Sequence, residues 1–235
     1  MRLIADGCSG QNKNSMLIGA VSSWLQKEAP ENIKTVEIVF PITGHSFIPP
    51  DRVFGNIEKR IRKHSTIDNP TKYKDLISEF ATVIQVGSDQ CQVLDYKTAN
   101  QAIFKKTGQW KMTILQCKRF FIIRSGKNNV KVRGELFYKN DLSSYQILTK
   151  PKHSLNNYKP EIVPINSVRV KAKKIADVKN LLKTHWGEEW EKVPNLKWYV
   201  KVFDNIDKQA PMGENEEEDE EELCCCVEEP TELII

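Results

Sequence analysis

The residues best suited to chemistry follow two short apolar runs near the start of the sequence. Asp6 closes the run over residues 2–5 and opens a glycine-containing turn. The second run, residues 36–40, leads into a polar stretch that contains His45 and then Asp51. An acidic residue and a glycine turn at the carboxyl end of a buried strand are where open α/β sheets place ligand-binding groups. The two runs therefore mark a candidate site.

Two carboxylates at one sheet edge would favour a divalent cation. If the strands over residues 2–5 and 36–40 are adjacent and parallel, Asp6 and Asp51 face each other across a cleft. The carboxylates would repel each other unless a cation lies between them, and oxygen-only ligands suit Mg²⁺ or Mn²⁺. A metal pair held in this way activates water or a 3′-hydroxyl for attack on a phosphodiester. The simpler alternatives are a turn residue at Asp6 and a helix cap at Asp51.

The elements that must position these residues alternate between strands and helices. A helix is expected after the glycine turn, with Asn12 or Asn14 as its cap. A second helix is expected from near Asp51, and a third after Asn69, where proline takes the first helical position. Residues 1–80 therefore predict the order strand–helix–strand–helix–helix, which is an α/β pattern with the two strands parallel.

After residue 81 the pattern changes to short β-rich runs. The expected strands cover residues 82–86, 92–95, 111–116, 119–124 and 130–138, and a last helix covers residues 175–186. We therefore expect a partial α/β core over residues 1–100, a small basic β-rich (α+β) module with a closing helix over residues 104–208, and a disordered acidic tail over residues 209–235.

Two strings in the first half resemble a known group of proteins. Residues 5–14 read ADGCSGQNKN, and residues 44–58 read GHSFIPPDRVFGNIE. Together they resemble an uncharacterised family of transposon-derived, integrase-like and DDE-transposase-like domains with a ribonuclease-H-like fold. The resemblance covers about residues 1–80. It implies a transposon-derived protein whose ancestral activity is divalent-metal-dependent polynucleotidyl transfer, with Mg²⁺ or Mn²⁺ as cofactor if the site is complete.

The resemblance assigns roles to four residues. Asp6 matches the second catalytic position of that fold and Asp51 the third, both as metal ligands, and Glu58 is a rival for the third position. His45 would touch the scissile phosphate or orient Asp51; its alternative is a loop histidine bonded to backbone. The family's first catalytic aspartate, on an opening three-strand meander, has no counterpart in this sequence. We therefore expect a truncated, inactive form, whose exposed strand edge at residues 3–4 favours self-association.

The charge distribution favours a polyanionic partner. The sequence has 35 Lys and Arg against 31 Asp and Glu, and eleven of the acidic residues lie from Glu214 onward. Residues 1–213 therefore carry a net charge of +15, which attracts nucleic acid. We expect DNA as the partner, and a chromatin protein as a further one. The expected nucleic-acid contacts are Lys13, Arg52, Lys59, Arg60, Lys118, Arg119 and Arg124.

A non-catalytic nucleic-acid- or chromatin-binding protein is the alternative function. Basic residues alternate with aromatic ones between residues 105 and 137, a pattern with which small β-rich modules track a phosphate backbone. The opposing interpretation is an aromatic core with solvated lysines outside it. The acidic tail would either screen the basic body or only add solubility. Whether the chain is an enzyme stays open at this stage.

The remaining features limit the class of protein. No apolar run approaches the roughly 20 residues of a membrane helix, so we expect no membrane insertion. Three of the six cysteines are isolated and three are adjacent at residues 224–226, with no CxxC pair and no metal-binding spacing. This usage indicates reduced thiols and an intracellular location. We expect that location to be the nucleus.

Overall fold

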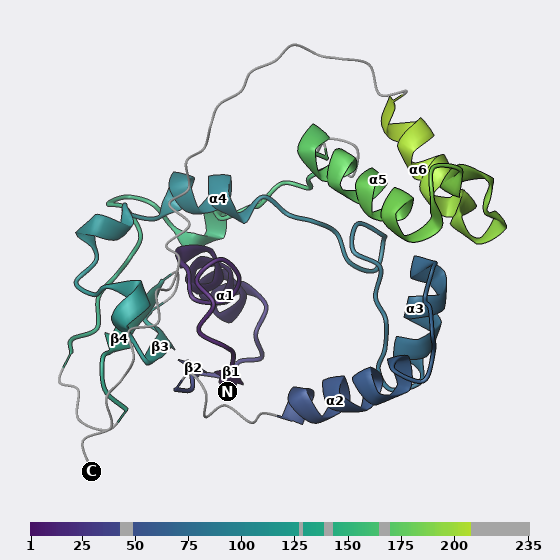
Figure 1. Ribbon diagram of the computed structural model, residues 1–235. Helices are drawn as coiled ribbons and strands as arrows, with labels where there is room; N and C mark the ends of the chain where they lie inside the picture. The colour runs from purple at the N-terminus through teal and green to yellow at the C-terminus, as the bar shows by residue number, and fades with distance from the viewer. Residues whose placement is uncertain (43–48, 127–128, 139–142, 165–169, 208–235) are drawn as a thin grey trace, which may run out of the picture. The chain divides into compact units, whose positions relative to one another are not determined.

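The chain forms two compact units in the computed structural model, which describes residues 1–42, 49–126, 129–138, 143–164 and 170–207 (Figure 1). The first unit spans residues 1–169 and the second begins at residue 170. The first unit combines helices with a mixed sheet, so the fold class is α/β as the sequence predicts. None of the described helices is long and apolar enough to cross a membrane.

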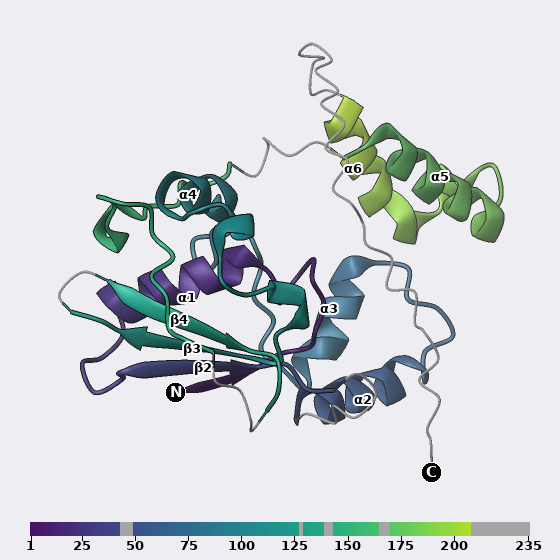
Figure 2. The ribbon, with the colours of Figure 1, turned by 90° about the vertical axis from the view of Figure 1, so that its left-hand side faces the viewer.

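The first unit is organised around a four-stranded sheet in the described residues, with the order β1-β2-β3-β4 (Figure 2). The strands are β1 (Arg2–Ile4), β2 (Thr35–Val39), β3 (Arg119–Arg124) and β4 (Val130–Glu135). β1 and β2 pair in parallel, which confirms the expectation for the first two strands. β2 pairs with β3 and β3 pairs with β4 in the antiparallel sense. β1 is therefore at one edge of the sheet.

Helix α1 (Ser15–Lys27) connects β1 to β2 and covers one face of the sheet (Figure 2). Its cap is Asn14, whose side-chain oxygen accepts the amide of Leu17 at 3.0 Å, so the second of the two expected caps is the correct one. Ile18 and Leu25 lie on the buried side of the helix at helical spacing. Burial of this apolar stripe holds the helix on the sheet.

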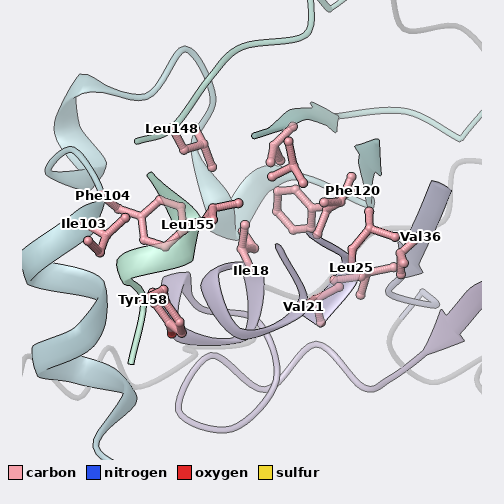
Figure 3. Packing of buried hydrophobic residues seen from close by; sticks show 14 of the residues in the cluster. Ile18, Val21, Leu25, Val36, Ile103, Phe104, Phe120, Leu148, Leu155 and Tyr158 are labelled. Atoms are coloured by element: carbon pink, nitrogen blue, oxygen red, sulfur yellow. The ribbon is translucent and has the colours of Figure 1, made fainter. Parts of the chain in front are cut away.

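The core lies between α1 and the sheet face that it covers (Figure 3). Alternate residues of each strand point into it, as the period of two in a strand requires. Phe120 is 1% exposed and packs edge-to-face against Phe40, with 5.9 Å between ring centroids. Tyr158 closes the other end of the core and packs in the same way against Phe104. The buried sheet and loop residues are Val36, Ile38, Ile122, Val130, Val132, Leu148 and Leu155.

Helix α4 (Tyr96–Ile103), which the sequence pattern does not predict, packs against α1 at a glycine. The Asn100 side chain donates to the Ser15 carbonyl at 2.7 Å and accepts from the Tyr158 hydroxyl at 2.7 Å. A Cβ atom added at Gly19 would lie 2.1 Å from Oδ1 of Asn100. The close approach of the two helices therefore depends on the absence of a side chain at position 19.

Gly19→Ala is expected to destabilise the protein by about 1–3 kcal/mol, because the new methyl group displaces the hydrogen-bonded Asn100 side chain. Gly55→Ala is the matched control, since Gly55 is also helical and has open space around its Cβ position. Helix propensity alone predicts a gain of about 0.5–1 kcal/mol there. Urea unfolding of both variants gives the comparison, and equal effects at the two glycines would contradict the close-approach explanation.

The helices between β2 and β3 differ slightly from expectation. Helix α2 (Pro49–Ile61) begins two residues before Asp51, so Asp51 lies in the first turn of the helix and is not its cap. Helix α3 (Pro70–Ser78) begins as predicted, with Asn69 as cap and proline at the first position. The two helices contact each other.

Three of the expected strands do not form. Residues 82–86 are irregular and precede a tight turn at Gly87. In residues 92–95 only Leu94 makes a bridge, to Ile162, and residues 111–116 end in a short 3₁₀ turn over Ile114–Gln116. Apolar alternation favours an extended chain, but a strand also needs a neighbour to pair with, and these segments have none beyond that bridge in the described residues.

The structure divides the chain at a different place from the division expected near residue 104. β3 and β4 join β2 in one sheet because their apolar faces complete the core over α1. The second unit is instead a small helical one, with α5 (Ala172–Trp186), α6 (Lys197–Asp207) and two 3₁₀ turns around Leu182, Trp190, Leu196 and Phe203. The expected acidic tail over residues 209–235 lies outside the described residues.

Candidate functional site

Asp6 organises the turn at the carboxyl end of β1. Its Oδ1 atom accepts the backbone amide of Cys8 at 3.2 Å and the side-chain amide of Asn12 at 2.7 Å. The residue is exposed, and its neighbour Ala5 still pairs with β2, through its amide to the Val39 carbonyl at 3.1 Å. The carboxylate therefore has the turn-forming role that the sequence left as an alternative, at the sheet edge where the ends of two parallel strands meet.

The rest of the turn is held together by one carbonyl. The Cys8 carbonyl oxygen accepts the amides of Gln11, Asn12 and Lys13 at 3.3, 2.8 and 2.9 Å. The Asn14 side chain also donates to the carbonyl of Ser9 at 3.2 Å. These bonds fix the turn as it enters α1, and they fix the position of Lys13.

Lys13 is buried, although the sequence predicts it as a surface contact to nucleic acid. The residue is 8% exposed, and its Nζ atom lies 5.4 Å from the centre of the Phe40 ring. Burial lowers the pKa of this amine, and the nearby positive charge of Lys118 lowers it further. No carboxylate in the part of the chain that the structure describes forms an ion pair with it. Lys13 is thus a buried amine beside the Phe40 ring, the Lys118 ammonium group and the Cys117 thiol, which raises its pKa slightly against the other two effects.

Two pockets adjoin this turn and share three residues, Ser15, Thr107 and Trp110. The Lys13 pocket has a volume of about 490 Å³, and the Lys106 pocket has a volume of about 590 Å³. The Lys13 pocket is also lined by Ser9, Lys13, Asn14, Gly108, Met112, Thr113, Ile114 and Leu115. The Lys106 pocket is also lined by Asn100, Gln101, Phe104, Lys105, Lys106 and Lys150. Among the described residues neither pocket has an Asp or Glu in its wall, while the walls contain four lysines.

The lysines of the Lys106 pocket are positioned by backbone carbonyls and by Trp110. Lys105 donates to the Ile147 carbonyl at 2.9 Å, and Lys150 donates to the Gln101 carbonyl at 2.7 Å near the end of α4. The Trp110 indole N–H donates to the Lys105 carbonyl at 3.0 Å. These acceptors are uncharged, so the pocket keeps its positive charge.

The residues that the family resemblance assigns to metal binding are separated by the undescribed stretch 43–48, which contains His45. Asp51 is half-buried in the first turn of α2, and Glu58 on the same helix forms an ion pair with Arg62 at 2.5 Å. The described residues contain no group of three or more His, Cys, Asp or Glu side chains placed to hold a metal ion.

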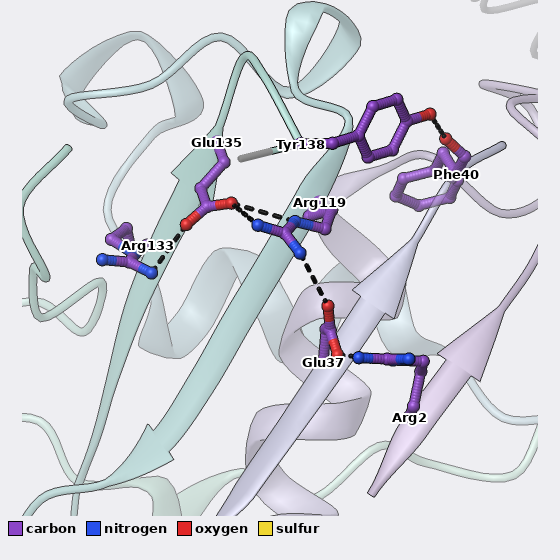
Figure 4. A network of polar contacts seen from close by, with 7 residues as sticks. All are labelled: Arg2, Glu37, Phe40, Arg119, Arg133, Glu135 and Tyr138. Carbon is purple, nitrogen blue, oxygen red and sulfur yellow. Dashed lines mark hydrogen bonds and ion pairs between the residues drawn. The ribbon is translucent and has the colours of Figure 1, made fainter. Parts of the chain in front are cut away.

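The sheet face opposite α1 carries a charged network (Figure 4). Glu37 accepts from Arg2 at 2.6 Å and from Arg119 at 3.3 Å. Glu135 accepts from Arg119 at 2.5 Å and from Arg133 at 2.6 Å. The side chains of Glu37 and Glu135 are 11% and 5% exposed, so the network neutralises buried charge.

Several other predicted contacts to nucleic acid have partners within the chain. Arg119 belongs to the network just described. Arg124 donates to the Ala29 carbonyl at 2.6 Å beyond the end of α1, and Arg60 pairs with Glu79 through two bonds of 2.8 and 3.1 Å. Arg52 and Lys59 on α2, and Lys118 before β3, are exposed.

The structure gathers a different set of cations from the one predicted. Lys105, Lys106 and Trp110 belong to the basic and aromatic pattern noted in the sequence, but Lys150 lies 40 residues beyond Trp110. The loop after β4 brings Lys150 to the end of α4 through the pairing of Phe104 with Thr149. The order of residues around Lys150 in the sequence does not indicate that it will lie near α4.

Comparisons with known proteins found nothing similar to this chain. A scan against protein-family models, a search of curated proteins and a search of solved structures each found no match.

Proposed function

We propose that this chain is a transposon-derived, integrase-like protein that binds nucleic acid in the nucleus without cutting it. The observation that carries the proposal is the pair of adjoining pockets, whose described walls contain four lysines and a tryptophan but no carboxylate. A concave surface of one sign of charge concentrates the opposite charge, and polyanions respond most strongly.

The chemistry of the two pockets suits a nucleic-acid strand. Lysine ammonium groups neutralise phosphates, and the binding free energy comes largely from the release of counterions. Trp110 belongs to the wall of both pockets and adds an aromatic residue to the lysines there. The combination of cations with an aromatic surface is the one used by proteins that bind single strands without strong sequence preference.

Fluorescence anisotropy with a labelled single-stranded 20-mer and its duplex tests the proposal. Binding is expected at low salt, and the logarithm of the affinity is expected to fall linearly with the logarithm of the salt concentration. Lys106→Glu is expected to weaken binding and to reduce the slope of that line by about 1, as for the loss of one phosphate contact.

Lys34→Glu is the matched control, because it makes the same charge change at an exposed residue outside both pockets. It is expected to change affinity much less than Lys106→Glu. Equal effects of the two substitutions would mean that only the net charge matters, and no binding at low salt would refute the proposal.

Metal-dependent polynucleotidyl transfer is the second candidate, and one observation favours it. β1 and β2 are adjacent and parallel, so Asp6 lies at the sheet edge where such a site would be built. Mg²⁺ or Mn²⁺ would be the cofactor, with Asp6 and Asp51 as ligands and Glu58 or His45 assisting.

Nicking of supercoiled plasmid distinguishes the two candidates. The binding proposal predicts no nicking above background with Mg²⁺ or Mn²⁺, for the full chain and for Asp6→Asn alike. Asp75→Asn, on α3, serves as a control with the same change of charge. Metal-dependent nicking by the unmodified chain that disappears in Asp6→Asn and persists in Asp75→Asn would establish the transferase.

A further inference from the structure

The wall of the Lys13 pocket contains a buried lysine that forms no ion pair with a carboxylate of the described residues. A buried ammonium group loses its hydration and normally regains that free energy from a carboxylate or from several acceptors. Lys13 is 8% exposed, and its amine lies near the Phe40 ring, the Lys118 ammonium group and the Cys117 thiol. Lys13 also belongs to the wall of the pocket, which places this residue beside whatever fills the pocket.

The other polar groups of the pocket are suited to an anion. Ser9, Asn14, Ser15, Thr107 and Thr113 supply hydroxyl and amide groups. The pocket also includes the start of α1, a helix of 13 residues. The first amides of a helix have no acceptor within it, and the helix dipole is positive at this end. Asn14 satisfies the amide of Leu17, which is one of them.

The size and the apolar wall of the pocket point to an organic anion. A volume of about 490 Å³ lies in the range of small-molecule sites and exceeds the volume of a single phosphate group. Trp110, Met112, Ile114 and Leu115 form an apolar wall in the same pocket. Such a wall accommodates a planar ring, whereas the Lys13 end accommodates negative charge.

We infer that the Lys13 pocket binds a nucleoside phosphomonoester, with the phosphate at Lys13 and the start of α1 and the base against the Trp110 wall. A free mononucleotide and the phosphorylated end of a nucleic-acid strand present this same chemistry. If the ligand is the end of a strand, the inference rests on the proposed nucleic-acid binding. If the ligand is a free mononucleotide, it does not.

Calorimetric titration of the full chain with AMP, adenosine and inorganic phosphate tests the site. AMP is expected to bind at least about tenfold more tightly than adenosine, as for the gain of charge-assisted hydrogen bonds, and more tightly than phosphate alone. Lys13→Met is expected to remove that preference, while Lys34→Met, an exposed control, keeps it. Equal affinity for AMP and adenosine, or unchanged AMP binding by a folded Lys13→Met, overturns the inference.

Amide NMR of the unmodified chain keeps the test independent of any folding defect in the variant. AMP is expected to shift the amides of Ser15 and Met16 at the start of α1 more than adenosine does. Equal shifts with the two compounds, or none, count against the site.

Oligonucleotides separate the two sources of the ligand. A 12-mer with a 5′-phosphate is expected to bind about tenfold more tightly than the same strand with a 5′-hydroxyl if the strand end occupies the pocket. AMP binding without this preference assigns the pocket to free nucleotides. Binding of both strands equally, with no AMP binding, overturns the inference and leaves the proposed function standing. AMP binding with no affinity for either strand supports the inference and refutes the proposed nucleic-acid binding.

Discussion

Phe120→Ala is expected to lower the free energy of unfolding by about 3–5 kcal/mol. It is also expected to reduce the protection of α1, in the first half of the chain, as well as that of its own strand β3. Phe120 is 1% exposed on β3 and contacts Phe40, which follows β2, so the cavity opens between the early and the late parts of the sheet. Denaturant unfolding measures the loss. Hydrogen exchange of the α1 amides is expected to accelerate together with that of β3.

Phe121→Ala provides the comparison from the other face of the same strand. Phe121 lies half-buried between Arg119 and Arg133, with 5.1 and 4.9 Å from its ring centre to the guanidinium carbons. Its removal is expected to cost about 1 kcal/mol, since it leaves no closed cavity. If Phe120→Ala accelerates exchange only in residues 119–135 and leaves α1 protected, the hairpin is a separate domain and the single-core description is wrong.

Glu135→Ala is expected to destabilise the chain by about 3 kcal/mol, at the lower end of the cost of breaking a buried charge pair. The Glu135 side chain is 5% exposed and bridges Arg119 and Arg133, and its loss leaves both guanidinium groups partly buried with less compensation. Glu58→Ala removes an exposed carboxylate paired with Arg62 and is expected to cost no more than about 0.5 kcal/mol.

A double-mutant cycle tests whether the network acts through its charges. The double variant Glu135→Met with Arg119→Met is expected to be more stable than the sum of the two single changes predicts, because no charge then remains without its partner. Strict additivity in urea unfolding would show that the two residues contribute through packing alone.

The elements that the sequence predicts well are those with local signals. Asn14 and the apolar stripe define α1, and the proline after Asn69 defines α3. The parallel pairing of β1 and β2 follows from the connecting helix between them. Each of these signals lies in the element that it specifies, next to it, or in the segment that connects two paired elements, so a pattern along the chain is enough to find it.

The features that the sequence analysis missed depend on contacts between distant residues. The pattern of residues 119–138 predicts a hairpin correctly, but nothing in it says that β2 is the neighbour. Helix α4 is short and is held by the bonds of Asn100 to Ser15 and Tyr158, which are 85 and 58 residues away. Lys13 illustrates the same limit at the site, because its burial depends on a fold that its own segment does not determine.

The position of β2 in the sheet has a consequence for synthesis of the chain. β2 pairs with β1 almost at once, but its other edge pairs with β3, which begins at Arg119. About 80 residues separate the two strands, and at about 5–20 residues per second the ribosome needs roughly 4–16 s to make them. During that time an apolar strand edge on the nascent chain has no neighbour, which makes it a natural client for a chaperone until the hairpin arrives.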